Sequence, residues 1–145
     1  MSAIEPSPAR HLTSEADAIE TARQVAAQIA ELAADPRNNG QLPHRQAELL
    51  SSSGLTAIAV PAQFGGLGAS VQTVVETVRL VSTADGGVGQ LLQIHNVMLR
   101  GIFTGYPDEV RDRLIADVLA GKRFGNALAE VGGKNKFALK TRVER

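Results

Sequence analysis

The sequence predicts a mainly helical domain that is followed by the first strands of a β-sheet. Apolar residues recur at helical spacing in five segments between residues 14 and 121. Aromatic residues make up only 3% of the chain and cysteine is absent, so the core must be built from small aliphatic side chains. After Gly121 the apolar period changes to the alternation of a strand.

The first predicted helix begins at Thr13 or Ser14, either of which can cap its first turn. Asp17 follows Ser14 at a spacing close to that of a capping box. The helix ends before Asp35-Pro36, because the residue before a proline disfavours helical geometry. Its predicted apolar stripe consists of Ile19, Ala22, Val25, Ala26, Ile29 and Ala33.

A second helix is predicted over residues 44–53, with Pro43 in its first turn and Gly54 at its end. A short apolar run then continues to Pro61. The connection over residues 61–68 is rich in glycine, which permits positive φ angles and therefore tight turns.

The third predicted helix covers residues 71–85 and is capped by Ser70. Because β-branched residues form helices poorly in isolation, we expect burial to stabilise it. Its predicted buried stripe consists of Val71, Val74, Val75, Val78 and either Leu80 or Val81.

Two further helices are predicted after the break at Gly86-Gly87. The first, over residues 88–103, carries Arg100 as its only charged residue, which indicates burial either at the centre of the domain or against a partner subunit. The second covers residues 108–121, opens at Pro107, has acidic residues in its first turn and stops at Gly121.

Two strands are predicted at the carboxyl end, over residues 124–130 and 136–145. In the second, Phe137, Leu139, Thr141 and Val143 alternate with polar or small residues. Two strands alone are marginal in water, so we expect them to be the start of an incomplete β-domain. The predicted organisation is a disordered arm at residues 1–12, a helical domain at 13–121 and the β-domain start at 122–145.

Charge is balanced over the whole chain but not along it. Residues 1–121 contain 8 basic and 13 acidic residues, whereas residues 122–145 contain 7 basic and 2 acidic ones. The basic tail suits either contact with phosphate or the solvated face of a strand. With zero net charge, no apolar leader and no membrane-length apolar segment, we expect a cytoplasmic protein that binds neither nucleic acid nor membrane.

Motifs for known chemistries are mostly absent. The glycine-rich stretches do not fit a dinucleotide or P-loop pattern, and no histidine has metal-ligand spacing, so no metal is predicted. No catalytic residue is predicted in this chain. His95 and Asn96 are two polar residues inside the least charged helix, and they either line a substrate pocket or are satisfied by a neighbouring backbone carbonyl.

Three stretches, taken in order, resemble the acyl-CoA dehydrogenase family. The most specific is GLTAIAVPAQFGGLG at residues 54–68, between two predicted helices. FGNALAE at residues 124–130 is similar to the first strand of that family's middle β-domain, and GGKN at residues 132–135 lies where the family has a glycine-rich turn. The resemblance covers roughly residues 12–145 and implies the N-terminal helical domain of that fold.

The resemblance also implies a function. It predicts the N-terminal segment of a flavin-dependent oxidoreductase that binds FAD or FMN and a small-molecule substrate and forms a homo-oligomer. The residues expected to contact flavin are Asn126, Leu128 and Ala129. Ala129 stands where dehydrogenases usually have a threonine, and Asn126 where they often have an aromatic residue. This pattern looks more like the sulfur-acquisition and desulfurisation branch, whose members use reduced flavin and oxygen.

Two alternatives remain open from the residues alone. Asn126 can donate a hydrogen bond to a flavin carbonyl or a flavin-bound oxygen, or it can face solvent on an edge strand. The chain as a whole can equally be a helical assembly or interaction module without chemistry, in which the nearly uncharged segment 88–103 forms an oligomer interface.

Overall fold

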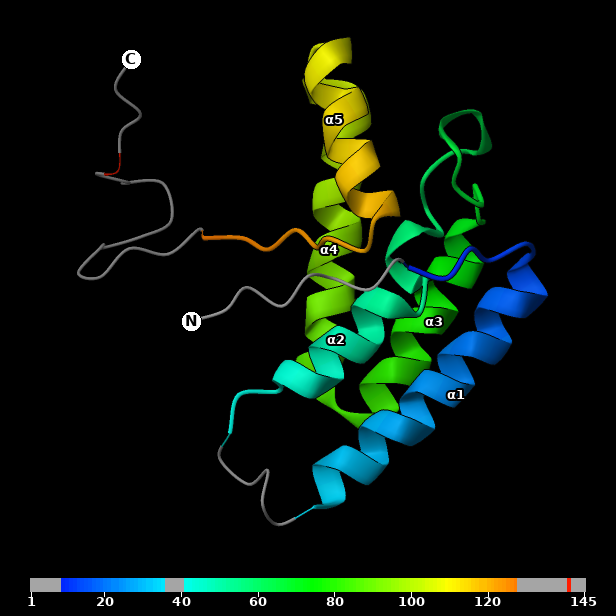
Figure 1. Cartoon of the computed structure of the whole chain (residues 1–145), viewed down its shortest axis with the longest axis vertical. Helices are drawn as coiled ribbons and strands as arrows, with labels where there is room; N and C mark the ends of the chain where they lie inside the picture. Colours follow the sequence, from blue (N-terminus) through cyan, green and yellow to red (C-terminus); the bar gives the residue numbers. More distant parts are fainter. Residues whose placement is uncertain (1–8, 36–40, 128–140, 142–145) are drawn as a thin grey trace.

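The computed structural model describes residues 9–35, 41–127 and 141, and all regular structure within these ranges is helical (Figure 1). The elements, in chain order, are α1 (Glu15–Ala34), α2 (His44–Ser52), the short 3-10 helices η2 (Leu55–Ala57) and η3 (Ala62–Phe64), α3 (Val71–Ala84), α4 (Gly86–Gly105) and α5 (Asp108–Leu119). Helix α3 packs against both α1 and α4, and α2 packs against α1 and α4. The predicted mainly helical class is confirmed.

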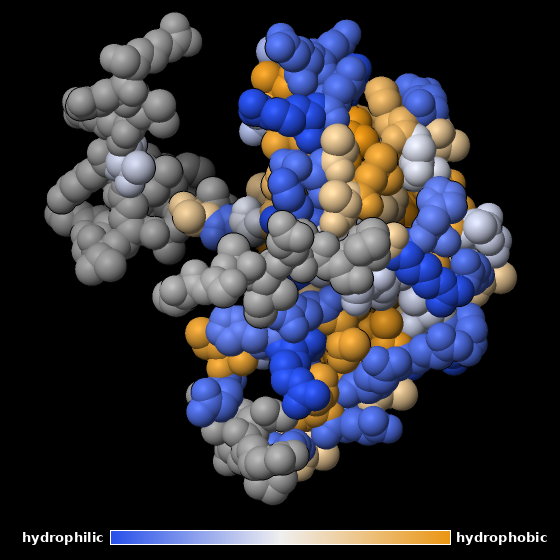
Figure 2. Space-filling view, in the orientation of Figure 1, coloured by the Kyte–Doolittle hydropathy of each residue, from blue (hydrophilic) through white to orange (hydrophobic). Residues whose placement is uncertain are grey.

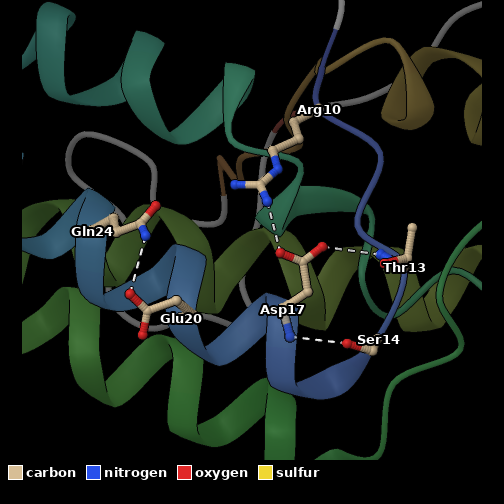
Figure 3. A network of polar contacts seen from close by, with 6 residues as sticks. All are labelled: Arg10, Thr13, Ser14, Asp17, Glu20 and Gln24. Carbon is tan, nitrogen blue, oxygen red and sulfur yellow. Dashed lines mark hydrogen bonds and ion pairs between the residues drawn. The ribbon is translucent and has the colours of Figure 1, made fainter.

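The start of α1 is fixed by a network of polar contacts (Figure 3). The Ser14 hydroxyl accepts a hydrogen bond from the Asp17 N–H at 3.0 Å, as the capping pattern predicts. The Asp17 carboxylate in turn accepts one from the Thr13 N–H at 3.2 Å and pairs with Arg10 at 2.7 Å. The helix ends at Ala34, directly before the predicted boundary.

Residues 9–12, which were expected to belong to a disordered arm, pack against the helices. The Arg10 N–H donates to the Ser52 carbonyl at 2.9 Å, and Leu12 is only 4% exposed within the core. The backbone of this segment passes close to Gly54, where only a glycine fits: a Cβ added at Gly54 (φ +84°) would lie 2.1 Å from the Arg10 carbonyl oxygen. Residues 1–8 of the predicted arm lie outside the described residues.

The predicted glycine-rich connection between the second and third helices is confirmed. It contains η3, whereas η2 lies in the apolar run before it. Gly65 and Gly68 both have positive φ. The Ala69 N–H donates to the Ile58 carbonyl at 2.8 Å, which brings the chain back before α3 begins. Phe64 of η3 packs on Phe103 of α4, with ring centroids 5.7 Å apart.

The predicted buried face of α3 is partly wrong. Val71 and Val75 are 67% and 60% exposed. Leu80 and Val81 are buried as predicted, and Val74 and Val78 are partly buried against the core. The other buried residues of the helix are Thr73 and Thr77. Two threonines can take the inner face because their hydroxyls are paired, that of Thr73 with the Glu15 carboxylate at 2.5 Å and that of Thr77 with the Val74 carbonyl at 2.8 Å.

Helix α4 begins two residues earlier than predicted. The Asp85 carboxylate accepts hydrogen bonds from the Gly87 and Val88 N–H groups at 2.8 and 3.0 Å, so the glycine pair forms the first turn instead of a break. The helix is buried along one face, which carries Val88, Gly89, Leu92, His95, Leu99 and Ile102. On its outer face, Val97 is 49% exposed.

The hydrophobic core has two parts. The larger lies among α1, α2, η2, α3 and the first half of α4. The smaller is formed by Val60, Leu99, Ile102, Ile115 and Val118, where the second half of α4 meets α5. Hydrophilic residues cover much of α1 on the face shown in Figure 2, whereas hydrophobic residues reach the surface beside α5.

The predicted first strand, residues 124–130, is described only over 124–127, and these residues form no strand. A strand needs a neighbouring strand to receive its backbone hydrogen bonds. Here the Phe124 N–H donates to a histidine side chain instead. The rest of this segment, and the second predicted strand except Thr141, lie outside the described residues.

Candidate functional site

A group of polar contacts that joins distant parts of the chain lies where the backbone leaves α5. Gly121 has φ +87°, and a Cβ there would lie 2.8 Å from the Ser51 carbonyl at the end of α2. This turn directs residues 122–127, here called the exit segment, away from α5 and across α4 (Figure 1).

Two basic side chains fasten the beginning of the exit segment. Lys122 pairs with Asp117 of α5 at 2.7 Å. The Arg123 guanidinium donates to the Ala47 carbonyl and to the Ser51 hydroxyl, both on α2. Burial lowers the pKa of Arg123 below its ordinary value, and the nearby Glu48 carboxylate opposes this.

His95 of α4 joins the exit segment to η2 through both of its ring nitrogens. Its Nε2 lies 2.8 Å from the Thr56 carbonyl oxygen, and its Nδ1 accepts a hydrogen bond from the Phe124 N–H at 3.0 Å. The His95 and Phe124 rings stack, with centroids 5.6 Å apart and an angle of 11° between planes. The His95 side chain is fully buried.

These partners define the protonation state of His95. A carbonyl oxygen can only accept a hydrogen bond, so Nε2 carries the proton and Nδ1 presents its lone pair to Phe124. Burial lowers the pKa of His95 below 6.5, as does the positive charge of Arg123, while the Thr56 carbonyl acts in the opposite direction. The ring is therefore a neutral connector near neutral pH.

Asn96 lies beside His95 and is only half satisfied. Its Nδ2 donates to the Leu92 carbonyl at 2.8 Å, whereas its Oδ1 is buried and finds no partner among the described residues. A buried acceptor of this kind costs about 1–3 kcal/mol unless a water or ligand pairs with it. The assignment of His95 and Asn96 to a substrate pocket stays a prediction.

An open groove of about 250 Å³ lies between residues 9–12, the loop at Gly65–Leu67 and Leu119 of α5. Of its charged lining groups, Arg10 is already paired with Asp17. Neither His95 nor Asn96 lines this groove. The groove is therefore separate from the residues predicted to line a substrate pocket, and its own lining offers no converging set of polar groups.

The helical elements described above coincide with a known domain. The sequence model for the acyl-CoA dehydrogenase N-terminal domain matches residues 13–122, which is most of the chain. The chain belongs to the acyl-CoA dehydrogenase family. The matched region contains the five α-helices found among the described residues and ends at Lys122, where the exit segment begins.

Several curated proteins are similar to this acyl-CoA dehydrogenase family member. The probable FMNH2-dependent monooxygenase SfnC of Pseudomonas putida is 32% identical over 57% of this chain and 21% of its own length. The dibenzothiophene monooxygenase of Rhodococcus erythropolis is 34% identical over 54% of this chain and 19% of its own length. That of Mycolicibacterium goodii is 30% identical over 79% of this chain and 28% of its own length.

The matched part of this family member thus spans a fifth to rather more than a quarter of the length of these relatives. No solved structure shows a significant match to the chain. Asn126, predicted to contact flavin, is solvent-exposed two residues after Phe124. Leu128 and Ala129 lie outside the described residues, so the flavin contacts stay predictions.

The sequence interpretation missed Thr56, Arg123 and Phe124. No local pattern could have found them, because His95 meets Thr56 and Phe124 across 39 and 29 residues of chain. Among the described residues, no three His, Cys, Asp or Glu side chains gather in a way that could hold a metal ion. No helix in the same ranges combines the length and hydropathy that crossing a bilayer requires.

Proposed function

We propose that this chain is the N-terminal helical part of a flavin-dependent monooxygenase that uses reduced FMN and oxygen to oxidise a small sulfur compound. The observation that carries the proposal is the similarity of its helical region to SfnC and to two dibenzothiophene monooxygenases. The replacement of the dehydrogenases' usual threonine by Ala129, and the polar Asn126, agree with that branch of the family. FAD in place of FMN is the alternative cofactor.

The flavin would supply the redox chemistry, and the protein would supply binding and orientation. In this proposal the helical domain holds the exit segment and thereby presents Asn126, whose amide donates to a flavin oxygen. Leu128 and Ala129 would add contacts to the flavin ring. The catalytic groups and most of the flavin and substrate sites belong to the remainder of a longer, homo-oligomeric polypeptide.

The test uses the complete polypeptide that carries these residues, supplied with FMN, NADH and a flavin reductase, with dibenzothiophene as the probe. We expect oxygen uptake that depends on both reduced flavin and probe, together with oxygenated product. Reduction of bound flavin by an acyl-CoA without oxygen uptake would assign the protein to the dehydrogenases instead. In the same assay Asn126→Leu should lower turnover more than the matched exposed change Gln93→Leu on α4.

The 145-residue chain provides a second test of where the site lies. We expect it to retain no FMN after gel filtration, because three residues at one end of the chain cannot enclose a flavin ring. Stoichiometric yellow flavin in the purified chain would contradict this placement of the site.

A second candidate function is a helical assembly module without chemistry. It is favoured by the exposure of Val71, Val75 and Val97 on α3 and α4. Sedimentation of the wild-type chain and of Val97→Asp tests this candidate, because a chain that is monomeric with and without the substitution would argue against an assembly module. Leu91, which packs against the core, is less suited to this test because its replacement would also disturb folding.

A further inference from the structure

We propose that His95 is a positioning residue, a neutral clasp that fastens the exit segment to the helical domain and releases it when the ring takes up a second proton. The clasp consists of the Nε2–H bond to the Thr56 carbonyl and the bond from the Phe124 N–H to Nδ1. The role of the clasp in orienting Asn126 rests on the proposed function, whereas the existence of the clasp and its response to protonation do not.

The geometry makes His95 the link between three separate elements. The ring belongs to α4, its Nε2 reaches η2 and its Nδ1 reaches the exit segment. In a neutral imidazole one nitrogen donates and the other accepts, so both ring positions are satisfied at once. The stacked Phe124 ring covers one face of the imidazole.

Protonation reverses one half of this arrangement. A proton on Nδ1 converts the acceptor of the Phe124 N–H into a second donor, so two N–H groups face each other and the bond is lost. The bond to Thr56 survives because Nε2 donates in both forms. The release is therefore directional: the exit segment is freed from Phe124 onward, while Lys122 and Arg123 keep their contacts and His95 stays attached to η2.

The charged surroundings of the ring favour the closed form. Arg123 of the exit segment is the charged group whose field acts on His95, and it opposes a second positive charge there. Glu48 of α2 faces Arg123, and Asp117 of α5 is paired with Lys122. Residues Leu55–Ala57 of η2 contain no titratable side chain, so no carboxylate from that side compensates a protonated ring.

The experiment is NMR of the ¹⁵N-labelled 145-residue chain between about pH 8 and about pH 5. We expect the ring nitrogen shifts of His95 to report the Nε2–H tautomer at the upper end. The exchange protection of the Phe124 amide, corrected for the intrinsic pH dependence of exchange, should fall by about tenfold as the ring is protonated, the equivalent of losing one hydrogen bond.

Two variants separate the clasp from general folding. His95→Gln keeps one donor and one acceptor without a titrating group, so it should retain Phe124 protection at both ends of the pH range. His95→Leu removes both groups and should leave Phe124 unprotected throughout, with the helical circular dichroism retained. His11→Gln changes an exposed histidine and should behave like the wild-type chain.

An Nδ1–H tautomer, an unprotected Phe124 amide near pH 8, or protection in His95→Leu equal to that of the wild-type chain would each overturn the proposal. If His95→Leu does not fold, the tautomer and the His95→Gln comparison still decide it. No measurement involves flavin, so failure of the clasp and failure of the monooxygenase assay are separate results.

Discussion

At the beginning of α3, one carboxylate from another helix completes the cap. Glu15, the first residue of α1, accepts hydrogen bonds from the Ser70 N–H at 2.7 Å, the Ser70 hydroxyl at 3.0 Å and the Thr73 hydroxyl at 2.5 Å. The Ser70 hydroxyl in turn accepts from the Thr73 N–H at 3.3 Å. A negative charge at a helix N-terminus is favourable. Through these hydrogen bonds Glu15 also joins α1 to α3 at the end where both helices begin.

The first prediction concerns acid stability. The Thr73 hydroxyl, followed by the Ser70 N–H and hydroxyl, lowers the pKa of Glu15 below 4.5. The unfolded chain therefore takes up this proton more readily, so the stabilisation is present above pH 4.5 and is lost as pH falls through the folded-state pKa. We expect Glu15→Gln to lower the urea midpoint at neutral pH and to flatten its decline in acid.

The matched control for this prediction is Glu31→Gln, at an exposed position on the same helix. The urea midpoint of this variant should decline in acid as that of the wild-type chain does. If the urea midpoints of Glu15→Gln and the wild-type chain declined equally in acid, the Glu15 carboxylate would not be the source of this pH-dependent stability. Ser70→Ala should cost about 1 kcal/mol in the same measurement, because it removes the cap of α3.

The second prediction compares two glycines. Gly54→Ala places a Cβ 2.1 Å from the Arg10 carbonyl at a positive φ, so the loss of stability should exceed the roughly 1–2 kcal/mol of the backbone strain alone. Gly101→Ala lies within α4, where an added Cβ meets nothing within 4 Å, and should stabilise the chain by about 1 kcal/mol. Urea unfolding of both variants measures the difference, and the same sign for both would contradict the geometry.

At the scale of elements, the sequence predicts the ends of helices better than their faces. Ser14, Ser70 and Gly121 act through neighbours a few residues away, so their roles were correctly predicted. The inner face of α3 was predicted only in part. Leu80 and Val81 are buried as expected. The burial of Thr73 was missed because it depends on Glu15, 58 residues earlier in the chain. The partners of His95 were missed for the same reason, because they too are far away in the sequence. The predicted strands depended on strand pairing, which residues 124–127 do not make.

The third prediction tests the corrected face of α3. Val81→Ala removes two methyl groups from a fully buried position and should cost about 2 kcal/mol. Val75→Ala makes the same chemical change at a side chain that is 60% exposed and should alter the free energy of unfolding by less than about 0.5 kcal/mol. The urea midpoints of the two variants decide between the faces, since the valine stripe expected from sequence requires similar losses at both positions.

Considered as a whole, the molecule is a helical body with a smaller second core at one end. Helix α4 belongs to both cores, with Val88 and Leu92 in the larger and Leu99 and Ile102 in the smaller. The smaller core joins α5 to the rest, and the exit segment leaves from the end of α5. Movement of α5 would therefore act on the exit segment through Lys122, against the contacts of Arg123 with α2 and of Phe124 with His95.

The fourth prediction follows from this unequal division. Because free energy of local opening scales with the apolar surface that is exposed, α5 should open at lower free energy than α1 and α3. Native-state hydrogen exchange should show lower protection for amides near Ile115 than for those near Val25 and Val81. Val118→Ala should lower α5 protection while α1 keeps its wild-type values. Uniform loss across all helices would instead mean that the two cores open as one cooperative unit, in which case α5 could not move the exit segment independently.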